Sequence, residues 1–325
     1  MRIGVSGVGS IGMRHLRLLS DLPEIEVYAY DAMPRTVPAA VTACDSFEAL
    51  LDAGLDGLVV ATPDPTHAPQ TIAACRRGVR VLVEKPVADS VAAAAEVAAV
   101  AAETGVPVLV GYVLRHYEVV RQVRALLADG SIGTPLSAQV SLGAYETLRL
   151  ARNRFSPTDR YRLPYDYSHE WDYLQWFFGP VARACAVARQ AGDLPLTQDP
   201  NIVDGILVLE SGLTATFHLD YVQDGGGRRL EVVGDRGTLR AELAHGLVRL
   251  RNHGEPMTRE YDRTEPRDSA FHRQLTHFLD VVAGRAEPIV TVHDGLRALA
   301  VADAIVASAE SATWSAVNSG PRRLD

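Results

Sequence analysis

The stretch that decides the fold lies near the start of the chain and reads Ile3-Gly4-Val5-Ser6-Gly7-Val8-Gly9-Ser10-Ile11-Gly12. Its first four residues are typical of a short buried strand, and a Gly-x-Gly-x-x-Gly turn follows at once. Beyond the turn, Met13, Leu16 and Leu19 recur at helical spacing. A strand, this turn and a helix in succession predict a dinucleotide-binding site, for which the glycine pattern alone would be weak support.

Each part of the turn has a role in the predicted site. Gly7 permits the tight turn, Gly9 lets a pyrophosphate approach the backbone, and Gly12 allows the helix to pack closely. The unpaired amides at the helix start, at Ser10 and Ile11, then face the phosphates. We therefore assign these residues to cofactor binding.

Asp31 bears on which dinucleotide the site prefers. The second predicted strand, Glu26–Tyr30, ends at Asp31, about twenty residues beyond the glycines, where a carboxylate can accept both hydroxyls of the adenosine ribose. A carboxylate there repels a 2′-phosphate, so the sequence favours NAD. Arg35 is close enough along the chain to hold such a phosphate, which leaves NADP open. The alternative for Asp31 is a turn residue before Pro34.

A second informative stretch is Val81-Leu82-Val83-Glu84-Lys85-Pro86. Its three apolar residues predict a strand buried on both faces, and Pro86 ends this strand and keeps Lys85 extended. Ligands of open parallel sheets bind beyond the carboxyl ends of the strands, so Lys85 leaves the core where a ligand would lie. A surface Glu84–Lys85 pair is the alternative for an isolated pair, but the surrounding motifs favour a site.

Two more predicted strands lead to the same edge of the sheet. Gly57–Ala61 is followed by Thr62-Pro63 and then His67, which are candidates to line the nicotinamide ribose. For His67, a capping or packing role is the alternative. Val106–Val110 completes an alternation of strands and helices, which predicts an α/β Rossmann domain with a doubly wound parallel sheet over residues 1–118.

Beyond residue 118 the pattern of the sequence changes. One helix is predicted at Glu118–Leu127, and extended segments joined by tight turns follow it. The predicted strands are Pro135–Tyr145, Val181–Ala188, Ile202–Glu210, Thr214–Tyr221, Leu230–Val233, Thr238–Leu243 and Leu247–Arg251. Helices at Ser269–Val282 and Gly295–Glu310 close the chain. Consecutive strands of this kind predict an α+β domain over residues 119–325 with a large, mostly antiparallel open sheet.

Within that second domain lies Tyr165-Asp166-Tyr167-Ser168-His169-Glu170-Trp171-Asp172. Apolar residues at helical spacing follow and end at Gly179-Pro180, which places His169 near the start of a helix. Glu170 and Asp172 fall in its first turn, where the helix dipole favours negative charge. Ionisable and aromatic side chains this close together predict a functional site, and a solvated acidic helix start is the alternative.

Composition argues against several other classes of protein. The net charge of −8 argues against a nucleic-acid-binding surface. Cys44, Cys75 and Cys185 form no metal-binding cluster and are typical of buried thiols in a reducing compartment, so we expect no metal. No signal-peptide pattern precedes the first strand, and the most apolar helix, Val91–Ala102, is too short to span a bilayer. We therefore expect a cytoplasmic protein without a membrane partner.

Taken together, these motifs resemble the Gfo/Idh/MocA family of glucose–fructose oxidoreductase and inositol dehydrogenase over nearly the whole chain. The matching elements are Gly7–Gly12 with His15, Ala61-Thr62-Pro63 with His67, Val81–Pro86, Asp166–Asp172 and Phe278-Leu279-Asp280. The resemblance implies a Rossmann domain and an antiparallel α+β domain whose open sheet face often forms oligomers, here a homodimer or homotetramer. It also implies NAD(P)-dependent hydride transfer at a secondary alcohol or ketone of a sugar, sugar derivative or cyclitol.

The resemblance also assigns roles to individual residues. Lys85 is similar to the family's active-site lysine, which with Glu84 borders the cofactor, and His169 is similar to the histidine that hydrogen-bonds the reacting hydroxyl. Many members place an aspartate four residues before this histidine, where this chain has Tyr165, and a sub-branch with Asp-x-Ser-His-Glu resembles Asp166. We expect His169 to carry the proton and Lys85 to polarise the oxygen. The reverse assignment, and proton donation by Tyr165, are alternatives.

Arginine and aromatic residues near the expected cleft favour a charged substrate, such as a uronate or a nucleotide-linked sugar, because arginines suit carboxylates and phosphates and aromatic faces suit sugar rings. These residues are Tyr112, Arg115, Arg152, Arg154, Arg160, Tyr161, Arg162, Tyr165 and Trp171. The expected substrate contacts are Lys85, Tyr112, Arg115, Tyr165, Asp166 and His169. Alternative functions are an NAD-using glycosidase of the same fold, a ligand-sensing regulator without turnover, and an imine or biliverdin-type reductase.

Overall fold

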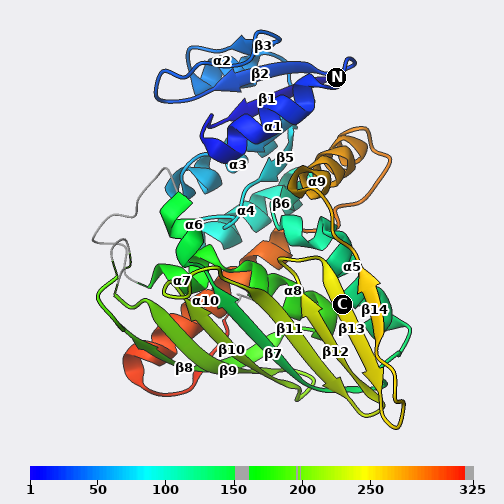
Figure 1. Cartoon of the computed structure of the whole chain (residues 1–325). Helices are drawn as coiled ribbons and strands as arrows, with labels where there is room; N and C mark the ends of the chain where they lie inside the picture. The colour runs from blue at the N-terminus through cyan, green and yellow to red at the C-terminus, as the bar shows by residue number, and fades with distance from the viewer. Residues whose placement is uncertain (151–160, 195–196, 198, 319–325) are drawn as a thin grey trace. The chain divides into compact units, whose positions relative to one another are not determined.

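The computed structural model describes residues 1–150, 161–194, 197 and 199–318 of the chain (Figure 1). These residues form two compact units. The first unit contains Met1–Val113 and Arg267–Leu299, and the second contains Leu114–Pro266 and Ala300–Asn318. The sequence places a single boundary after residue 118, whereas in the structure the segment Arg267–Leu299 joins the first unit.

The first unit is built on a six-stranded parallel sheet with the strand order β3-β2-β1-β4-β5-β6. Its strands are β1 (Arg2–Ser6), β2 (Glu26–Tyr30), β3 (Val41–Ala43), β4 (Gly57–Val60), β5 (Arg80–Val83) and β6 (Val108–Val110). Ile3 of β1 pairs with Val27 on one side and with Gly57 on the other, so the strand order reverses direction at β1. This topology confirms the predicted doubly wound sheet and creates a switch point at the carboxyl ends of β1 and β4.

Helices cover both faces of this parallel sheet. They are α1 (Ser10–Ser20), α2 (Phe47–Asp52), α3 (His67–Arg76), α4 (Val91–Thr104) and α9 (Arg267–Val282). Helix α4 begins where the Ser90 hydroxyl accepts a hydrogen bond from the Ala93 amide, and it ends at Gly105, whose φ of +66° is left-handed. Side chains alternate along β1, so Ile3 packs in a core cluster with α1 residues, whereas Gly4 leaves room for Leu50 of α2.

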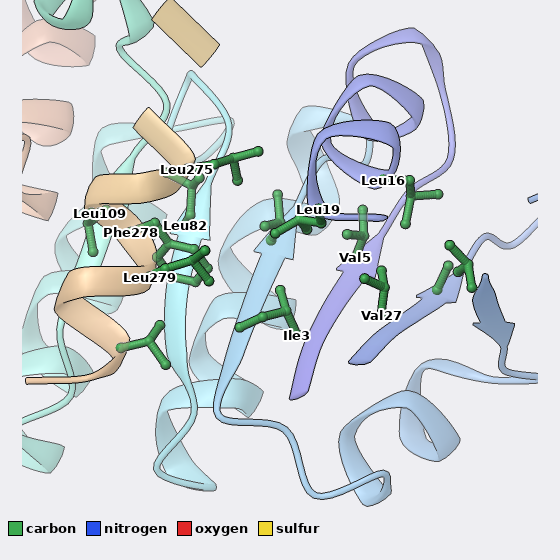
Figure 2. Close-up of a cluster of buried hydrophobic side chains, with 14 of the residues drawn as sticks. Ile3, Val5, Leu16, Leu19, Val27, Leu82, Leu109, Leu275, Phe278 and Leu279 are labelled. Carbon is green, nitrogen blue, oxygen red and sulfur yellow. The ribbon is translucent and has the colours of Figure 1, made fainter. Parts of the chain in front are cut away.

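Helix α9 explains why a late segment of the chain belongs to the first unit. Figure 2 shows Leu275, Phe278 and Leu279 of α9 in one cluster with Ile3 and Leu82 of the parallel sheet. A parallel sheet is buried on both faces, so this face needs a second helix beside α1. The sequence predicts the helix itself but contains no local signal for the sheet that it covers.

The second unit is built on a nine-stranded sheet with the order β14-β13-β12-β11-β7-β10-β9-β8-β15. Its strands are β7 (Pro135–Gly143), β8 (Val181–Arg189), β9 (Ile202–Leu209), β10 (Thr214–Asp220), β11 (Arg228–Gly234), β12 (Gly237–Glu242), β13 (Leu247–Asn252), β14 (Arg259–Asp262) and β15 (Ser315–Ala316). All pairs are antiparallel except β7 with β10. The predicted α+β class with a mostly antiparallel sheet is thus confirmed, with short strands β14 and β15 added.

The helices of this unit are α5 (Glu118–Ala128), α6 (Tyr145–Leu150), α7 (Arg162–Asp166) and α8 (His169–Phe178). The 3₁₀ helix η2 (Val113–His116) begins at the last residue of the first unit, and α10 (Val292–Ser311) belongs to the first unit up to Leu299 and to the second from Ala300. Trp171 of α8 meets Phe217 of β10 edge-on, with ring centroids 5.0 Å apart. Tyr145 was predicted to end a strand but begins α6 instead, because β7 stops at Gly143.

Among the described residues, no helix combines the length and the apolar character that a membrane-spanning segment needs.

We expect Phe278→Ala to destabilise the first unit selectively. Phe278 is fully buried in the α9 cluster, and its truncation leaves a cavity that costs about 3–5 kcal/mol. All three tryptophans, Trp171, Trp176 and Trp314, belong to the second unit, so tryptophan fluorescence follows that unit alone. Hydrogen exchange of β1 and β4 peptides should accelerate under denaturant while the fluorescence midpoint stays constant. The exposed Met257→Ala is the control, and an unchanged exchange rate in β1 would contradict the assignment of α9.

Candidate active site

The glycine turn has no space for side chains at two of its three glycines. Gly7 has a φ of +89°, and a Cβ there would lie 2.5 Å from the carbonyl oxygen of Ala61. A Cβ at Gly12 would lie 1.8 Å from the carbonyl oxygen of Gly7. At Gly9, in contrast, a Cβ would meet no atom within 4 Å. The turn therefore packs tightly against the end of β4 and leaves open space at Gly9, which fits a pyrophosphate.

The start of α1 is suited to an anion. Gly9 is its N-cap and supplies no side-chain hydrogen bond to the first turn, which begins at Ser10 and Ile11. The first amides of a helix carry the positive end of its dipole and need acceptors from outside the helix. Phosphate oxygens are such acceptors, so the predicted cofactor residues of this turn fit the dinucleotide.

Asp31 anchors the glycine turn. Its Oδ2 accepts a hydrogen bond from the Val8 amide at 2.6 Å, and its Oδ1 accepts one from the Met33 amide at 2.8 Å. The bond from Met33 shows that Asp31 is a turn residue before Pro34, which we considered as its alternative role. The bond from Val8 holds the same carboxylate against the glycine turn. Arg35 Nε lies 4.0 Å from Asp31 Oδ1, and the arginine side chain is half exposed.

The loop after β4 contains Thr62, Pro63 and His67. His67 is 1% exposed, with Nδ1 2.7 Å from the carbonyl oxygen of Pro86 and Nε2 2.7 Å from that of Thr62. Both ring nitrogens thus contact the backbone, so the packing role that we considered as the alternative for His67 is present in the structure. The buried Thr62 hydroxyl has no hydrogen-bond partner among the described residues, so it is available to a ligand.

The Glu84-Lys85-Pro86 turn follows β5 as predicted. Glu84 donates its backbone amide to Val60 of β4, and its Oε1 lies 2.8 Å from Nε2 of the buried His15. Lys85 is partly buried, its peptide bond to Pro86 is cis, and it is the only lysine in the sequence. The first unit thus brings the glycine turn, Asp31, Thr62 and Lys85 to the carboxyl edge of one sheet.

In the second unit, His169 is the first residue of α8, and its acidic neighbours are buried. Glu170 pairs with Arg228 of β11 at 2.7 Å, and Asp172 accepts two hydrogen bonds from Arg115, at 2.9 and 2.6 Å. Neither carboxylate is solvated, so a solvated acidic helix start is excluded. Because each charge is paired and hydrogen-bonded, the first turn of α8 is held in place next to His169.

Two residues predicted to contact the substrate are deeply buried. Arg115 has only 3% of its side chain exposed, and its guanidinium binds Asp172 and lies 5.1 Å from the ring centroid of Trp176. Tyr112, in the first unit, is fully buried. Burial and the contacts of Arg115 give these residues structural roles within their own units, and their predicted contact with a substrate stays a prediction.

Asp166 and Tyr165, the two acidic-partner candidates, have different surroundings. Asp166 accepts hydrogen bonds from Arg162 and from the Tyr221 hydroxyl, each at 2.7 Å. Tyr165 donates its hydroxyl to Asp303 at 2.8 Å. Burial, together with the Asp303 carboxylate, raises the pKa of the Tyr165 phenol well above its usual value. Tyr165 is therefore a weak acid that is already engaged with a carboxylate, which argues against it as the proton donor.

Other predicted residues are only partly covered by the structure. Arg152, Arg154 and Arg160 lie outside the described residues, whereas Tyr161 and Arg162 lead into α7. Sequence reasoning missed three residues that bond to the motif, because they come from distant parts of the chain: Tyr221 directly after β10, Arg228 of β11 and Asp303 of α10. Their local sequence contains no signal of this role. No group of three His, Cys, Asp or Glu side chains in the described ranges is arranged to hold a metal.

Comparison with known proteins identifies the family. Residues 1–112 match the profile described as "Oxidoreductase family, NAD-binding Rossmann fold", and residues 124–317 match "Oxidoreductase family, C-terminal alpha/beta domain". The chain belongs to the Gfo/Idh/MocA family. As a Gfo/Idh/MocA protein it is an oxidoreductase with an NAD-binding Rossmann domain, and the geometry of the glycine turn agrees with that cofactor.

Several relatives match over most of their length. The chain is 29% identical to a 1,5-anhydro-D-fructose reductase of Ensifer adhaerens, over 83% of this chain and 82% of the relative. It is 27% identical to an inositol 2-dehydrogenase of Mycolicibacterium gilvum, over 96% and 91%. Among solved structures, a levoglucosan dehydrogenase in complex with NADH aligns with a TM-score of 0.86 at 16% identity, over 98% and 99% of the two chains. That last likeness shows that the two chains share a fold.

We expect two glycine substitutions to separate packing from cofactor binding. Gly12→Ala should lower both stability and NAD affinity, because its Cβ would lie 1.8 Å from the Gly7 carbonyl oxygen. Gly9→Ala should leave the melting temperature of the free protein within about 2 °C, because a new Cβ meets no atom there, yet weaken NAD binding by at least about tenfold. Calorimetric titration with NAD and thermal unfolding measure the two effects. Unchanged NAD affinity in Gly9→Ala would contradict a pyrophosphate at this turn.

Proposed function

We propose that this chain is an NAD-dependent dehydrogenase or reductase that acts on a secondary alcohol or ketone of a sugar, sugar derivative or cyclitol. The observation that carries the proposal is the placement of the only lysine, Lys85, directly beyond β5 at the carboxyl edge of the NAD-binding sheet. The names of the relatives, a reductase of an anhydro sugar and an inositol dehydrogenase, support the substrate class.

The chemistry divides between cofactor and protein. Bound nicotinamide supplies the site that accepts or gives the hydride. The chain orients the substrate and moves one proton, which we assign to Lys85 and His169 acting on the same substrate oxygen. In the oxidation direction, the Lys85 ammonium polarises the hydroxyl and the His169 imidazole accepts its proton; both steps run in reverse during reduction. Histidine suits the base because its ordinary pKa lies near neutral pH.

Asp166 is proposed as a residue that orients this pair. Its two carboxylate oxygens accept hydrogen bonds from Arg162 and Tyr221, which fixes the direction of the side chain. Lys85 belongs to the first unit and His169 to the second, so their convergence on one oxygen is the part of the mechanism that mutational kinetics must test.

The finer predictions from the sequence are part of the same proposal. A uronate or nucleotide-linked sugar is the candidate substrate because of the arginines near the motif, of which Arg162 is bonded to Asp166.

Assembly into a homodimer or homotetramer is proposed through the open face of the second sheet, where Val187 and Ile206 are exposed. We place the enzyme in the cytoplasm, where a reduced and an oxidised nicotinamide pool are both available.

We expect Lys85→Met to lower turnover by about 10³-fold while changing the Kd for NAD by less than about threefold, because the lost group acts on the substrate oxygen. The assay follows NADH absorbance with NAD and a panel of cyclitols, neutral sugars, uronates and nucleotide sugars. Lys85→Arg keeps the positive charge and is the matched control, with partial activity expected. Full activity in Lys85→Met would refute the role of this residue.

The same panel separates the alternative functions. Accumulation of NADH indicates a dehydrogenase, whereas release of an aglycone without net NADH would indicate the NAD-using glycosidase. Tight NAD binding without hydride exchange against every compound would indicate a regulator. Reduction of an imine or a biliverdin-type substrate, with no reaction on alcohols, would indicate the remaining alternative.

We expect Asp31→Asn to weaken the preference for NAD over NADP by at least about tenfold, because it removes the charge that opposes a 2′-phosphate. The asparagine amide oxygen can still accept the hydrogen bond from Val8, so the contact with the glycine turn should stay, although the bond that Met33 donates to the other carboxylate oxygen is lost. The ratio of kcat/KM for the two cofactors measures the effect. In the double variant with Arg35→Ala, the NADP activity should fall again, and an unaltered cofactor ratio in Asp31→Asn would rule out a ribose contact.

A further inference from the structure

Two buried histidines hold the Glu84-Lys85-Pro86 turn from opposite sides of Lys85. His15 is fully buried, and its Nε2 lies 2.8 Å from Glu84 Oε1. His67 is 1% exposed, and its Nδ1 lies 2.7 Å from the carbonyl oxygen of Pro86. The residue before Lys85 and the residue after it are thus each hydrogen-bonded to an imidazole that solvent does not reach.

The contact of His15 is fixed by its surroundings. His15 lies on α1, three residues after Gly12, and its ring packs edge-on against Phe271 of α9 with centroids 6.0 Å apart. A Cβ at Gly111 would lie 2.7 Å from Glu84 Oε2, so a residue without a side chain gives the carboxylate its place. The ring and the carboxylate are thus both confined by packing, which holds His15 Nε2 and Glu84 Oε1 in contact.

The contact of His67 spans two loops. Its Nδ1 faces the Pro86 carbonyl oxygen and its Nε2 faces the Thr62 carbonyl oxygen, each at 2.7 Å. A carbonyl oxygen only accepts hydrogen bonds, so both bonds form together only when both ring nitrogens carry a proton. In that form the ring ties the loop after β4 to the turn after β5, and Lys85 lies immediately beside this tie.

We propose that His15 and His67 are positioning residues that set the direction in which Lys85 leaves the sheet. His15 belongs to the helix that follows the glycine turn, and His67 follows the Thr62-Pro63 loop, so each histidine links a segment of the cofactor site to the lysine turn. The inference depends on the proposed function only for the statement that Lys85 acts on the substrate. Neither histidine contacts the reacting atoms; both act through Lys85.

The single lysine makes the position of this side chain directly observable. Selective ¹³C labelling of lysine Cε in the full-length chain, without a lysine-containing tag, gives one lysine side-chain signal. In the wild type this signal should differ from that of free lysine and should shift on addition of NAD. His15→Ala and His67→Ala should move it toward the free-lysine position and reduce its response to NAD. With substrate, kcat should fall by about tenfold to hundredfold while the Kd for NAD changes by less than about threefold.

Conservative variants distinguish positioning from folding. His15→Gln keeps an N–H donor for Glu84 and should restore most of the wild-type signal and kcat. His67→Gln can donate to only one of the two carbonyl oxygens and should be intermediate. His272→Ala, at an exposed histidine on α9 of the same unit, is the control and should change neither.

The outcomes separate this inference from the proposed function. If both alanine variants fold and leave the Lys85 signal and kcat at wild-type values, the positioning role is wrong. If the alanine variants do not fold, a Gln variant of His67 with the wild-type signal would equally overturn it. If the signal moves as expected but no sugar or cyclitol reacts with the wild type, the positioning of Lys85 stands and the proposed function fails.

Discussion

The tight packing of the glycine turn against the end of β4 determines much of what surrounds it. With no side chain at Gly7 or Gly12, α1 can start directly against Ala61, where even a methyl group would overlap backbone atoms. Helix α1 in turn carries His15, which reaches Glu84 beside Lys85. The same packing that presents helix amides to a pyrophosphate therefore also fixes the turn that carries the candidate catalytic lysine.

Paired buried charges hold the helix start that carries His169. The first turn of α8 has two carboxylates that are both removed from water, and each is matched by an arginine from another element, Arg115 or Arg228. Burying ion pairs costs desolvation energy that the pairing must offset, and losing one partner leaves a buried charge that costs several kcal/mol. Such an arrangement does little for net stability, and any other orientation of this helix start would leave a buried charge without its partner. We interpret it as the means by which the second unit holds its histidine.

Local patterns in the sequence were sufficient to predict individual helices, strands and turns. They were insufficient to predict which of these elements and residues contact one another. The glycine turn, the strand before Lys85 and the helix start at His169 are each encoded by neighbouring residues, and the structure confirms all three. The packing of α9 on the parallel sheet could not be predicted, because its apolar face would suit either sheet. The contacts of His67 with Pro86 and of Arg115 with Asp172 could not be predicted for the same reason, since these partners lie 19 and 57 residues away along the chain.

The central claim is that Lys85 stands beside the reactive ring of NAD, on a turn held by the cofactor-binding elements. A crystal structure of the chain with NAD bound tests it most directly, through the position of Lys85 Nζ relative to nicotinamide C4. We predict that the pyrophosphate lies against the amides at Gly9–Ile11. We also predict that Lys85 Nζ lies on the face of the nicotinamide ring where the substrate binds, so that one substrate oxygen can contact both Nζ and the ring. A dinucleotide bound away from the glycine turn, or an Nζ directed away from the ring, would contradict the account.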